Sequence, residues 1–417
     1  MNLATKKNIP ATNQQILEFV KEYETPFYIY DEKGIREGVR KLTKAFAWAP
    51  DFKEYFAVKA CPIPGIIQIL KEEGSGTDCS SIAELIISEK LGIVGEDIMF
   101  TSNNTPVYEY QKAIDLGAVL NLDDFSHIDY VQEHIGLPEL VSFRYNPGEA
   151  RAGNAIIGNP REAKYGFTKE QLLEGYKKLK GYGVKRFGLH TMVASNELNI
   201  EYFYETARML FGLMKEIKEE TGCEIELIDM GGGIGIPYKP EDTAIDLEVL
   251  GAGVQKIYQE LVLDKGMALK RLSLECGRLI TGPHGYLITK AIHYKNTYKN
   301  YIGVDACMAN LMRPALYGAY HHITVVGKED HPHNQIYDVV GSLCENNDKF
   351  AIDRTLPTIE TNDVLVIHDA GAHGSSMGFH YNGKLHCPEY LLEEKKCELR
   401  LIKNGETLED YFSTFIW

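Results

Sequence analysis

The sequence lacks several features that would point to a membrane, a metal or a nucleic acid. No run approaches the roughly 18 consecutive apolar residues of a membrane-spanning helix, and no apolar stretch follows the lysines near the amino terminus. We therefore expect neither a membrane span nor a secretory signal. No C-x-x-C pair is present, which excludes zinc-ribbon and thioredoxin-type motifs. Basic residues are outnumbered 44 to 59, and the net charge of −15 argues against nucleic acid or an anionic membrane surface as the main partner.

The remaining composition is that of an ordinary globular protein. The chain has 417 residues, of which 44% are hydrophobic, which is enough for a large core, and its length predicts two domains. In a chain of this size, cysteines without metal-site spacing indicate reduced thiols and a cytoplasmic location. The eight are Cys61, Cys79, Cys223, Cys276, Cys307, Cys344, Cys387 and Cys397.

Short β-rich runs alternate with amphipathic stretches from about residue 53 to 278. Between the runs, apolar residues recur every three or four positions, as on one face of a helix. This alternation favours a (β/α)₈ barrel over residues 38–282, although an open doubly wound sheet would give a similar pattern. The eight predicted strands are Glu54–Lys59, Gly76–Ser80, Ile98–Ser102, Val119–Asp123, Leu140–Asn146, Arg186–Met192, Ile225–Met230 and Leu272–Glu275.

The pattern changes after residue 280, where predicted strands follow one another without helices, which indicates an all-β domain. Pro26–Asp31 is one more predicted strand ahead of the barrel. We therefore expect a barrel followed by an all-β carboxyl-terminal domain. Residues 1–37 and 283–417 would form this β-sandwich-like unit, with the amino-terminal strand joining its sheet. Its other predicted strands are Tyr286–Tyr294, Tyr301–Val304, Ile323–Val326, Ile336–Val340, Val364–Ile367 and Glu398–Ile402.

Two candidate functional features stand where predicted barrel strands end, which is where sites collect in such barrels. Lys59 ends the first strand, and it is either a surface terminus or a desolvated amine held for covalent chemistry. Four glycines occupy five positions between Gly231 and Gly235 after the seventh strand. A tight turn needs one glycine but hardly four, so this loop favours a backbone cradle for a phosphate group.

Two further strand ends carry titratable side chains. Glu275 and Arg278 could form a salt bridge at the barrel rim, or could face a cofactor nitrogen and a substrate carboxylate respectively. His190 ends the sixth strand and is either a satisfied core histidine or a functional group. Four more histidines have the spacing of no common metal site, so we expect no metal and a solvated loop there. They are His321, His322, His331 and His333.

Taken together, these motifs resemble the fold-type III decarboxylases that depend on pyridoxal 5′-phosphate (PLP), and most closely their diaminopimelate decarboxylase branch. Such enzymes remove carbon dioxide from an amino acid, because a protonated pyridine ring accepts the electrons left on Cα. The motifs follow the family's order along nearly the whole chain. They are Ala57-Val-Lys59-Ala, Gly231-Gly-Gly-Ile-Gly235, Glu275-Cys-Gly-Arg278, Arg313-Pro-Ala-Leu-Tyr317, Cys344-Glu345-Asn-Asn-Asp348, Asp369-Ala-Gly-Ala372 and Tyr381-Asn382.

The resemblance implies a cofactor site. Lys59 would hold PLP covalently, Glu275 would keep the pyridine nitrogen protonated, and His190 would stack on the ring. Gly232 and Gly233 would cradle the phosphate. The implied cofactor-binding set is Lys59, Asp78, His190, Gly232, Gly233, Glu275, Gly277, Arg278 and Tyr381.

The resemblance also implies a substrate with charged groups at both ends. Cys344 would return a proton to Cα, and Glu345 would bind the distal ammonium. The Cys-Glu pair reaches the neighbouring subunit's site in this family, which implies a homodimer with active sites at the subunit interface. Two arginines favour the conversion of meso-2,6-diaminopimelate to L-lysine and CO₂, the last step of lysine biosynthesis. The implied substrate-binding set is Arg278, Arg313, Tyr317, Glu345 and Tyr381.

Several positions depart from the family's motifs. Val193 replaces the family's phosphate-binding serine, with Ser195 two residues on, and Cys61, Cys276, Cys307 and His373 replace the usual asparagine, proline, glycine and tyrosine. These departures leave open another charged substrate, such as D-ornithine, D-lysine or a carboxynorspermidine-like compound. A non-catalytic PLP-binding homologue is a further alternative, against which the retained lysine argues. An alanine-racemase-like enzyme is disfavoured by the Cys-Glu pair and the two arginines.

Overall fold

The computed structural model describes residues 7–151, 158–396 and 398–417, so Cys397 lies outside the described residues. The chain divides into two compact units. The barrel unit comprises Arg36–Ile236 and Ala244–Leu279, and the β unit comprises the amino-terminal residues up to Ile35, Pro237–Thr243 and Ile280–Trp417. The segment Pro237–Thr243 therefore belongs with the β unit, although it falls inside the range 38–282 that the sequence indicates for the barrel.

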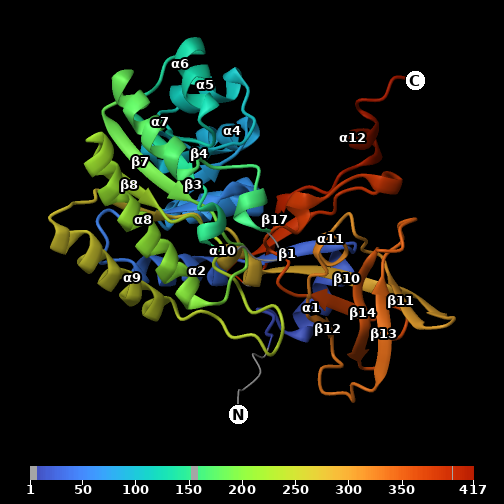
Figure 1. Ribbon diagram of the computed structural model, residues 1–417. Coiled ribbons are helices and arrows are strands. Elements are labelled where there is room, and N and C mark those ends of the chain that lie inside the picture. Colours follow the sequence, from blue (N-terminus) through green and yellow to red (C-terminus); the bar gives the residue numbers. More distant parts are fainter. Residues whose placement is uncertain (1–6, 152–157, 397) are drawn as a thin grey trace. The chain divides into compact units, whose positions relative to one another are not determined.

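The barrel unit contains a closed eight-stranded parallel barrel, which confirms the predicted fold class (Figure 1). Its strands are β2 (Lys53–Ala57), β3 (Gly76–Cys79), β4 (Ile98–Thr101), β5 (Val119–Leu122), β6 (Leu140–Tyr145), β7 (Arg186–Thr191), β8 (Ile225–Asp229) and β9 (Arg271–Leu274). The barrel closes where β9 pairs with β2.

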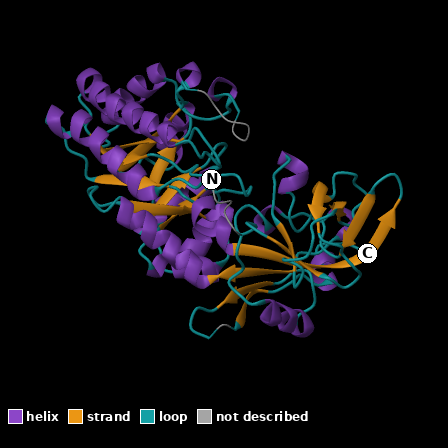
Figure 2. Ribbon diagram, turned by 90° about the horizontal axis from the view of Figure 1, so that it is seen from below, coloured by secondary structure: helices purple, strands orange, loops and turns teal. Residues whose placement is uncertain are grey.

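Helices cover the outside of the barrel strands, as the colouring by secondary structure in Figure 2 makes clear. Ser81 caps α4, one of these helices, by accepting a hydrogen bond from the backbone N–H of Glu84. The helices are α2 (Glu32–Ala45), α3 (Pro64–Glu72), α4 (Ile82–Lys90), α5 (Val107–Asp115), α6 (Ser126–His134), α7 (Lys169–Gly181), α8 (Ile200–Thr221), α9 (Leu247–Leu261) and the short α10 (Arg278–Thr281).

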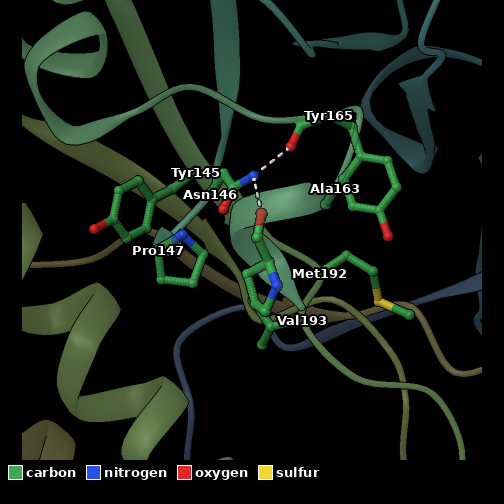
Figure 3. A pocket seen from close by; sticks show the side chains of 8 residues that line it. Tyr145, Asn146, Pro147, Ala163, Tyr165, Met192 and Val193 are labelled. Carbon is green, nitrogen blue, oxygen red and sulfur yellow. Dashed lines mark hydrogen bonds between the residues drawn. The ribbon is translucent and has the colours of Figure 1, made fainter. Parts of the chain in front are cut away.

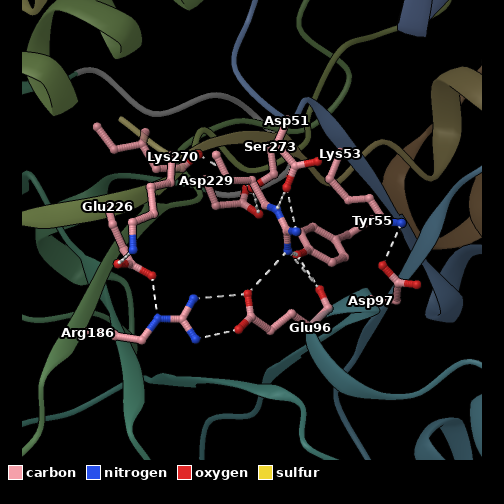
Figure 4. A network of polar contacts seen from close by, with 12 residues as sticks. Asp51, Lys53, Tyr55, Glu96, Asp97, Arg186, Glu226, Asp229, Lys270 and Ser273 are labelled. Atoms are coloured by element: carbon pink, nitrogen blue, oxygen red, sulfur yellow. Dashed lines mark hydrogen bonds and ion pairs between the residues drawn. The ribbon is translucent and has the colours of Figure 1, made fainter. Parts of the chain in front are cut away.

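The amino ends of the barrel strands are closed by a polar network, shown in Figure 4. Arg186 at the start of β7 donates hydrogen bonds to Glu96 and Glu226, and Arg271 at the start of β9 donates to Asp51 and to the Tyr55 hydroxyl. Every charged group in this set has a partner at that end. Functional side chains are therefore expected at the opposite, carboxyl ends of the strands.

The β unit is built on a nine-stranded sheet in which β1 lies between β10 and β16. Its strands are β1 (Phe27–Asp31), β10 (Gly285–Asn296), β11 (Asn300–Val304), β12 (Ile323–Val325), β13 (Gln335–Val340), β14 (Lys349–Leu356), β15 (Val364–Ile367), β16 (Glu389–Leu392) and β17 (Leu399–Lys403). Three helices accompany them: α1 (Asn13–Glu22), α11 (Arg313–Tyr317) and α12 (Leu408–Phe412). Ile16 and Val20 of α1 pack in one core cluster with Phe27 and Ile29 of β1.

Two sequence expectations need correction here. Lys59 does not end the first strand, because the chain leaves β2 at Ala57 and turns into a 3₁₀ turn over Val58–Ala60. His321 is not in a solvated loop. It is fully buried, and its ring nitrogens form hydrogen bonds with Arg313 and the His368 carbonyl inside the β unit. Among the described residues, the helices include none with the length and apolar character needed to span a bilayer.

Candidate active site

Lys59 lies just beyond the first barrel strand and forms an ion pair with the second. Its Nζ is 2.8 Å from Oδ2 of Asp78, which stands on β3 opposite Ala57. Asp78 is buried, whereas half of the Lys59 side chain is exposed. Burial lowers the pKa of the Lys59 ammonium, but the charges of Asp78 and Glu275 raise it more, and the net pKa lies above that of an ordinary lysine. The amine is therefore held in its protonated form at neutral pH.

Glu275 directly follows β9 and brings a second buried carboxyl group to the same end of the barrel. Burial, and then the charge of Asp78, raise its pKa to about 8. Its Oε2 lies 3.1 Å from Nε2 of His190. Its Oε1 is buried and has no hydrogen-bond partner among the described residues. A buried carboxyl oxygen without a partner is the kind of group that a cofactor nitrogen would satisfy.

His190 on β7 is held as a neutral ring by its neighbours. Burial lowers its pKa to about 4. The side-chain amide of Asn121 on β5 donates to Nδ1 at 3.0 Å, and it also lies 2.9 Å from the hydroxyl of Thr101 on β4. Because Nδ1 accepts, the ring proton is on Nε2 and is donated to Glu275. Groups on β4, on β5 and in the turn after β9 thus fix the orientation of this ring.

A metal is a poor occupant of this cluster. His190, Asp229 and Glu275 offer ligand atoms that lie within 4.8 Å of one another. However, both oxygens of Asp229 already accept hydrogen bonds, one from the Gly231 N–H at 2.7 Å and one from the Ser273 hydroxyl at 2.8 Å. Burial raises the pKa of Asp229 to about 7. The arrangement is that of a hydrogen-bonded cluster inside the barrel.

The glycine loop after β8 packs against neighbouring backbone so closely that side chains are excluded. A Cβ on Gly232 would lie 2.2 Å from the carbonyl oxygen of Glu275, and Gly231 and Gly233 have φ angles of +68° and +93°. The Gly232 N–H lies 3.4 Å from Sδ of Met192. Backbone packing and positive φ angles therefore account for glycine at positions 231 to 233. The same absence of side chains leaves the main chain open to a phosphate group at the carboxyl end of β8.

Arg278 and Gly277 complete the turn that begins with Glu275. Arg278 is buried at the start of α10, and its Nη2 donates to the Ser195 hydroxyl at 3.3 Å. A Cβ on Gly277 would lie 2.6 Å from Cβ of Ala60 and 3.2 Å from Cβ of Ala57. The turn is thus packed directly against the segment that carries Lys59.

A small hollow lies at the carboxyl ends of β6 and β7, shown in Figure 3. The Asn146 side chain holds it together by donating to the carbonyl oxygens of Pro160 and Tyr165, both at 2.9 Å. Met192 and Val193 contribute to its lining. Val193, which replaces the serine of the resembled motif, is therefore part of an apolar wall.

The sequence did not single out three buried side chains at this end of the barrel. Arg144 on β6 pairs with Asp123 and stacks over the Tyr165 ring at 4.4 Å. Asn121 orients His190, and Glu54 accepts a backbone hydrogen bond from Cys276. No local motif marks these residues, because their partners come from distant strands.

The remaining predicted residues lie in the β unit, in two groups. In the first, Arg313 at the start of α11 is buried, its Nη1 donates to Nε2 of His321 at 2.9 Å, and it stacks over the Tyr238 ring at 4.5 Å. His321 in turn donates from Nδ1 to the His368 carbonyl. Tyr317, at the other end of α11, is exposed.

In the second group, Cys344 and Glu345 lie on an exposed loop. The Cys344 N–H donates to Oδ1 of Asn382 at 2.8 Å, which brings this loop beside the exposed Tyr381. The buried Asp348 fixes the base of the loop by accepting from the backbone N–H of Leu343 at 2.8 Å. Cys344, Glu345 and Tyr381 thus belong to one local constellation.

Known proteins resemble the chain over nearly its full length. The family model described as pyridoxal-dependent decarboxylase, pyridoxal binding domain, matches residues 32–282. Protein TabA of Pseudomonas amygdali pv. tabaci is 41% identical over 96% of this chain and 93% of its own length. Diaminopimelate decarboxylase of Methanothermobacter thermautotrophicus is 35% identical over 94% of this chain and 92% of its own. The crystal structure of the Helicobacter pylori diaminopimelate decarboxylase complexed with L-lysine has a TM-score of 0.86 at 30% identity, covering 95% of this chain and 98% of that chain.

Proposed function

Because the chain belongs to the pyridoxal-dependent decarboxylases, we propose that it converts meso-2,6-diaminopimelate to L-lysine and CO₂, the last step of lysine biosynthesis. The observation that carries this choice is the pair of buried arginines, Arg278 at the end of the barrel and Arg313 in the β unit. A planar guanidinium suits the second carboxylate of diaminopimelate, a group that ornithine and lysine lack. Similarity to diaminopimelate decarboxylases over most of the chain supports the same choice.

PLP fits the residues at the end of the barrel. When bound, PLP supplies a protonated pyridine ring that accepts the electrons left on Cα as CO₂ departs. Glu275 has a buried oxygen without a hydrogen-bond partner among the described residues, and with its raised pKa it can share a proton with the ring nitrogen. His190, a neutral ring held by Asn121, would lie on the cofactor face. Lys59 would hold the cofactor, with Asp78 controlling the charge of its amine.

The other proposed cofactor and substrate contacts are those that the resembled motifs imply. Gly232 and Gly233, with Gly277, would let the backbone approach the phosphate. Arg278, Arg313 and Tyr317 would hold the distal carboxylate and Glu345 the distal ammonium, with Tyr381 beside cofactor and substrate. Cys344 would donate the proton that returns to Cα, and its loop is kept in place by the hydrogen bond to Asn382.

The direct test is CO₂ release from meso-diaminopimelate, with D-ornithine, D-lysine and carboxynorspermidine as parallel substrates. We expect turnover of diaminopimelate and chirally pure L-lysine as the product. A protein that releases no CO₂ from diaminopimelate but acts on a basic amino acid has another substrate, and racemised product without CO₂ indicates a racemase. The Lys59→Ala variant is the control, since it should lose both the visible absorbance of bound cofactor and turnover.

We further propose a homodimer in which each active site takes the Cys344–Glu345 loop from the partner. The exposure of this loop, with the catalytic candidate Cys344 at the surface of its own unit, supports the arrangement. Lys59→Ala and Cys344→Ala variants, each inactive, would complement each other when subunits exchange, because a mixed dimer has one intact site. Equal mixing should restore about a quarter of wild-type activity, given two-fold symmetry and random exchange. No recovery, with exchange shown by mass, would refute shared sites.

We propose a cytoplasmic location for the enzyme. The seven described cysteines are all free thiols, and catalysis through Cys344 needs the reduced form. Fractionation of cells followed by immunodetection tests the location.

A further inference from the structure

Glu54 is a buried acid on the first barrel strand whose role no motif explains. It is 3% exposed, and its Oε1 accepts a hydrogen bond of 2.7 Å from the backbone N–H of Cys276. Cys276 is the residue after Glu275, at the seam where β9 meets β2. Backbone pairing at this seam joins Lys53 with Ser273 and Glu54 with Leu274. The Glu54 side chain therefore adds one more contact between β2 and the end of β9, beyond the last residues whose backbones pair. This contact reaches the turn that carries Glu275.

The need for such an acceptor follows from the residue at position 276. The resembled motif has proline there, which has no N–H, whereas cysteine places a donor in the barrel interior. A buried donor without an acceptor is destabilising and would distort the turn that holds it. Glu54 removes that problem, and it does so from a strand 222 positions away in the sequence.

Two other contacts hold the turn after β9, one at Glu275 and one at Gly277. The Glu275 N–H donates to the Gly231 carbonyl at 3.0 Å, and the Glu275 carbonyl lies against Gly232. Gly277 packs against the segment that carries Lys59. Loss of the Glu54 contact would release the peptide group that joins Glu275 to Cys276, because its N–H is the donor that Glu54 holds. The residue most affected would be Glu275.

We propose that Glu54 is a positioning residue: by accepting the Cys276 N–H it fixes the main chain of Glu275 and so aims that carboxyl group at the cofactor. The inference rests on the role proposed for Glu275 toward PLP. It does not depend on which amino acid is decarboxylated.

The charge of Glu54 is not what this role requires. Burial raises the pKa of Glu54 well above its ordinary value, and the charges of Asp229 and Glu275 raise it further. The Cys276 N–H needs one acceptor oxygen, and a neutral carboxylic acid supplies it as well as a carboxylate does. A side-chain amide offers the same acceptor, so Glu54→Gln should preserve the function and Glu54→Leu, of similar size, should lose it.

The test measures PLP binding to the apoprotein, together with the pH dependence of the bound cofactor's visible absorbance. Glu54→Leu should weaken the Kd by about tenfold or more and shift the pH midpoint, because an unsatisfied buried donor displaces Glu275. Glu54→Gln should stay within about threefold of wild type in Kd, since its carbonyl can replace the carboxyl oxygen. Wild-type affinity and spectrum in Glu54→Leu, or an equal loss in both variants, would overturn the proposal.

Glu109 offers a matched control for a general loss of packing. It is also a buried glutamate, and its Oε1 accepts the Ile82 N–H at 2.9 Å, but that contact joins α5 to α4. Glu109→Leu should lower the stability to unfolding while leaving the cofactor Kd and absorbance unchanged. If Glu109→Leu changed both as Glu54→Leu does, the specific positioning role would be wrong.

A double variant removes the donor as well as the acceptor. In Cys276→Pro there is no N–H to satisfy, so adding Glu54→Leu should cost less than it does in the wild-type chain, and the double variant should bind PLP more tightly than Glu54→Leu alone. Equal or weaker binding would contradict the inference. If Glu54→Leu alone does not fold, the proposal expects Glu54→Gln to fold and bind PLP, and the double variant to recover folding. Failure of both would contradict it. Glu275→Gln separates the two proposals: if it leaves the cofactor spectrum unchanged, the assignment of Glu275 fails, and with it the role of Glu54.

Discussion

Replacing Asp78 with asparagine should make Lys59 react faster with the cofactor, although the change removes the ion-pair partner of that lysine. Lys59 Nζ and Asp78 Oδ2 are 2.8 Å apart, and Asp78 is the first of the charges that raise the lysine pKa. An amine must lose its proton before it can bond to the aldehyde carbon of the cofactor. Asparagine keeps the size and an oxygen acceptor but removes the charge, so a larger fraction of Lys59 is deprotonated at neutral pH.

The size of the effect follows from the exposure of the pair. Two unit charges about 4 Å apart attract by about 1 kcal/mol in water and about 4 kcal/mol at an effective dielectric of about 20. Half of the Lys59 side chain is exposed, so screening places the pair between these values, at about 1.5–3 kcal/mol. At about 1.4 kcal/mol per unit, the lysine pKa should fall by about one to two units. The rate constant for covalent loading at about pH 7 should then rise by about 10- to 100-fold.

Stopped-flow absorbance of apoprotein mixed with PLP, repeated across pH, measures this rate. The logarithm of the wild-type rate should climb with pH, and the Asp78→Asn profile should lie above it on the acid side. Asp97→Asn is the matched control, because Asp97 pairs with Lys53 at 2.7 Å at the other end of the barrel and should leave loading unchanged. A loading rate for Asp78→Asn at or below the wild-type value at neutral pH would refute the account of the Lys59 charge.

Three further outcomes are expected. Arg186→Met should lower the free energy of unfolding in urea by about 1–3 kcal/mol, since Glu96 and Glu226 each lose one of their donors. The exposed Lys270→Met should cost under about 0.5 kcal/mol, and equal effects would count against the network in Figure 4. Burial lowers the pKa of His368 to about 3 from 6.5, so the native state binds fewer protons than the unfolded chain between these values and stability is lost as pH falls. His368→Gln should therefore reduce the acid-side slope of unfolding free energy by about 1.4 kcal/mol per pH unit, and an unaltered slope would contradict this. Gly232→Ala should weaken PLP binding by about tenfold or more, because the new Cβ would lie 2.2 Å from the Glu275 carbonyl, and unchanged titration curves would show that the loop gives way freely.

The sequence predicts the barrel well because its signal is local. All eight predicted barrel strands are present, each ending one or two residues earlier than expected. In the β unit, β14 and β16 were missed. β14 contains Asp353 with a φ of +48°, which interrupts the alternation of buried and exposed residues. β16 begins with Glu389, a charged residue that does not look like part of a buried strand. It is nevertheless buried, because partners distant in sequence bond to its carboxylate: Tyr30, Ser375 and Lys403.

The site is predictable only as far as motifs reach. The four predicted residues lie at the ends of barrel strands or just beyond them, and the barrel brings their polar atoms together in two pairs: Lys59 with Asp78, and His190 with Glu275. What the sequence could not show is which groups hold them there. Those contacts join different strands of the barrel. The order of the strands around the barrel, and the pairing of the last strand with the first, exist only in the folded chain. Glu54, at that seam, is the clearest example.

The departures from the family's motifs bear on substrate identity less than their number suggests. Cys276 introduces a buried N–H, and Glu54 accepts it. Val193 lines an apolar hollow, while the hydroxyl of Ser195, two residues on, accepts from Arg278. Leaving the Cys276 donor unsatisfied would cost about 1–3 kcal/mol, so this change is accommodated by Glu54. For the reaction proposed above, Arg278 is the barrel residue that would face the substrate carboxylate, and it is retained.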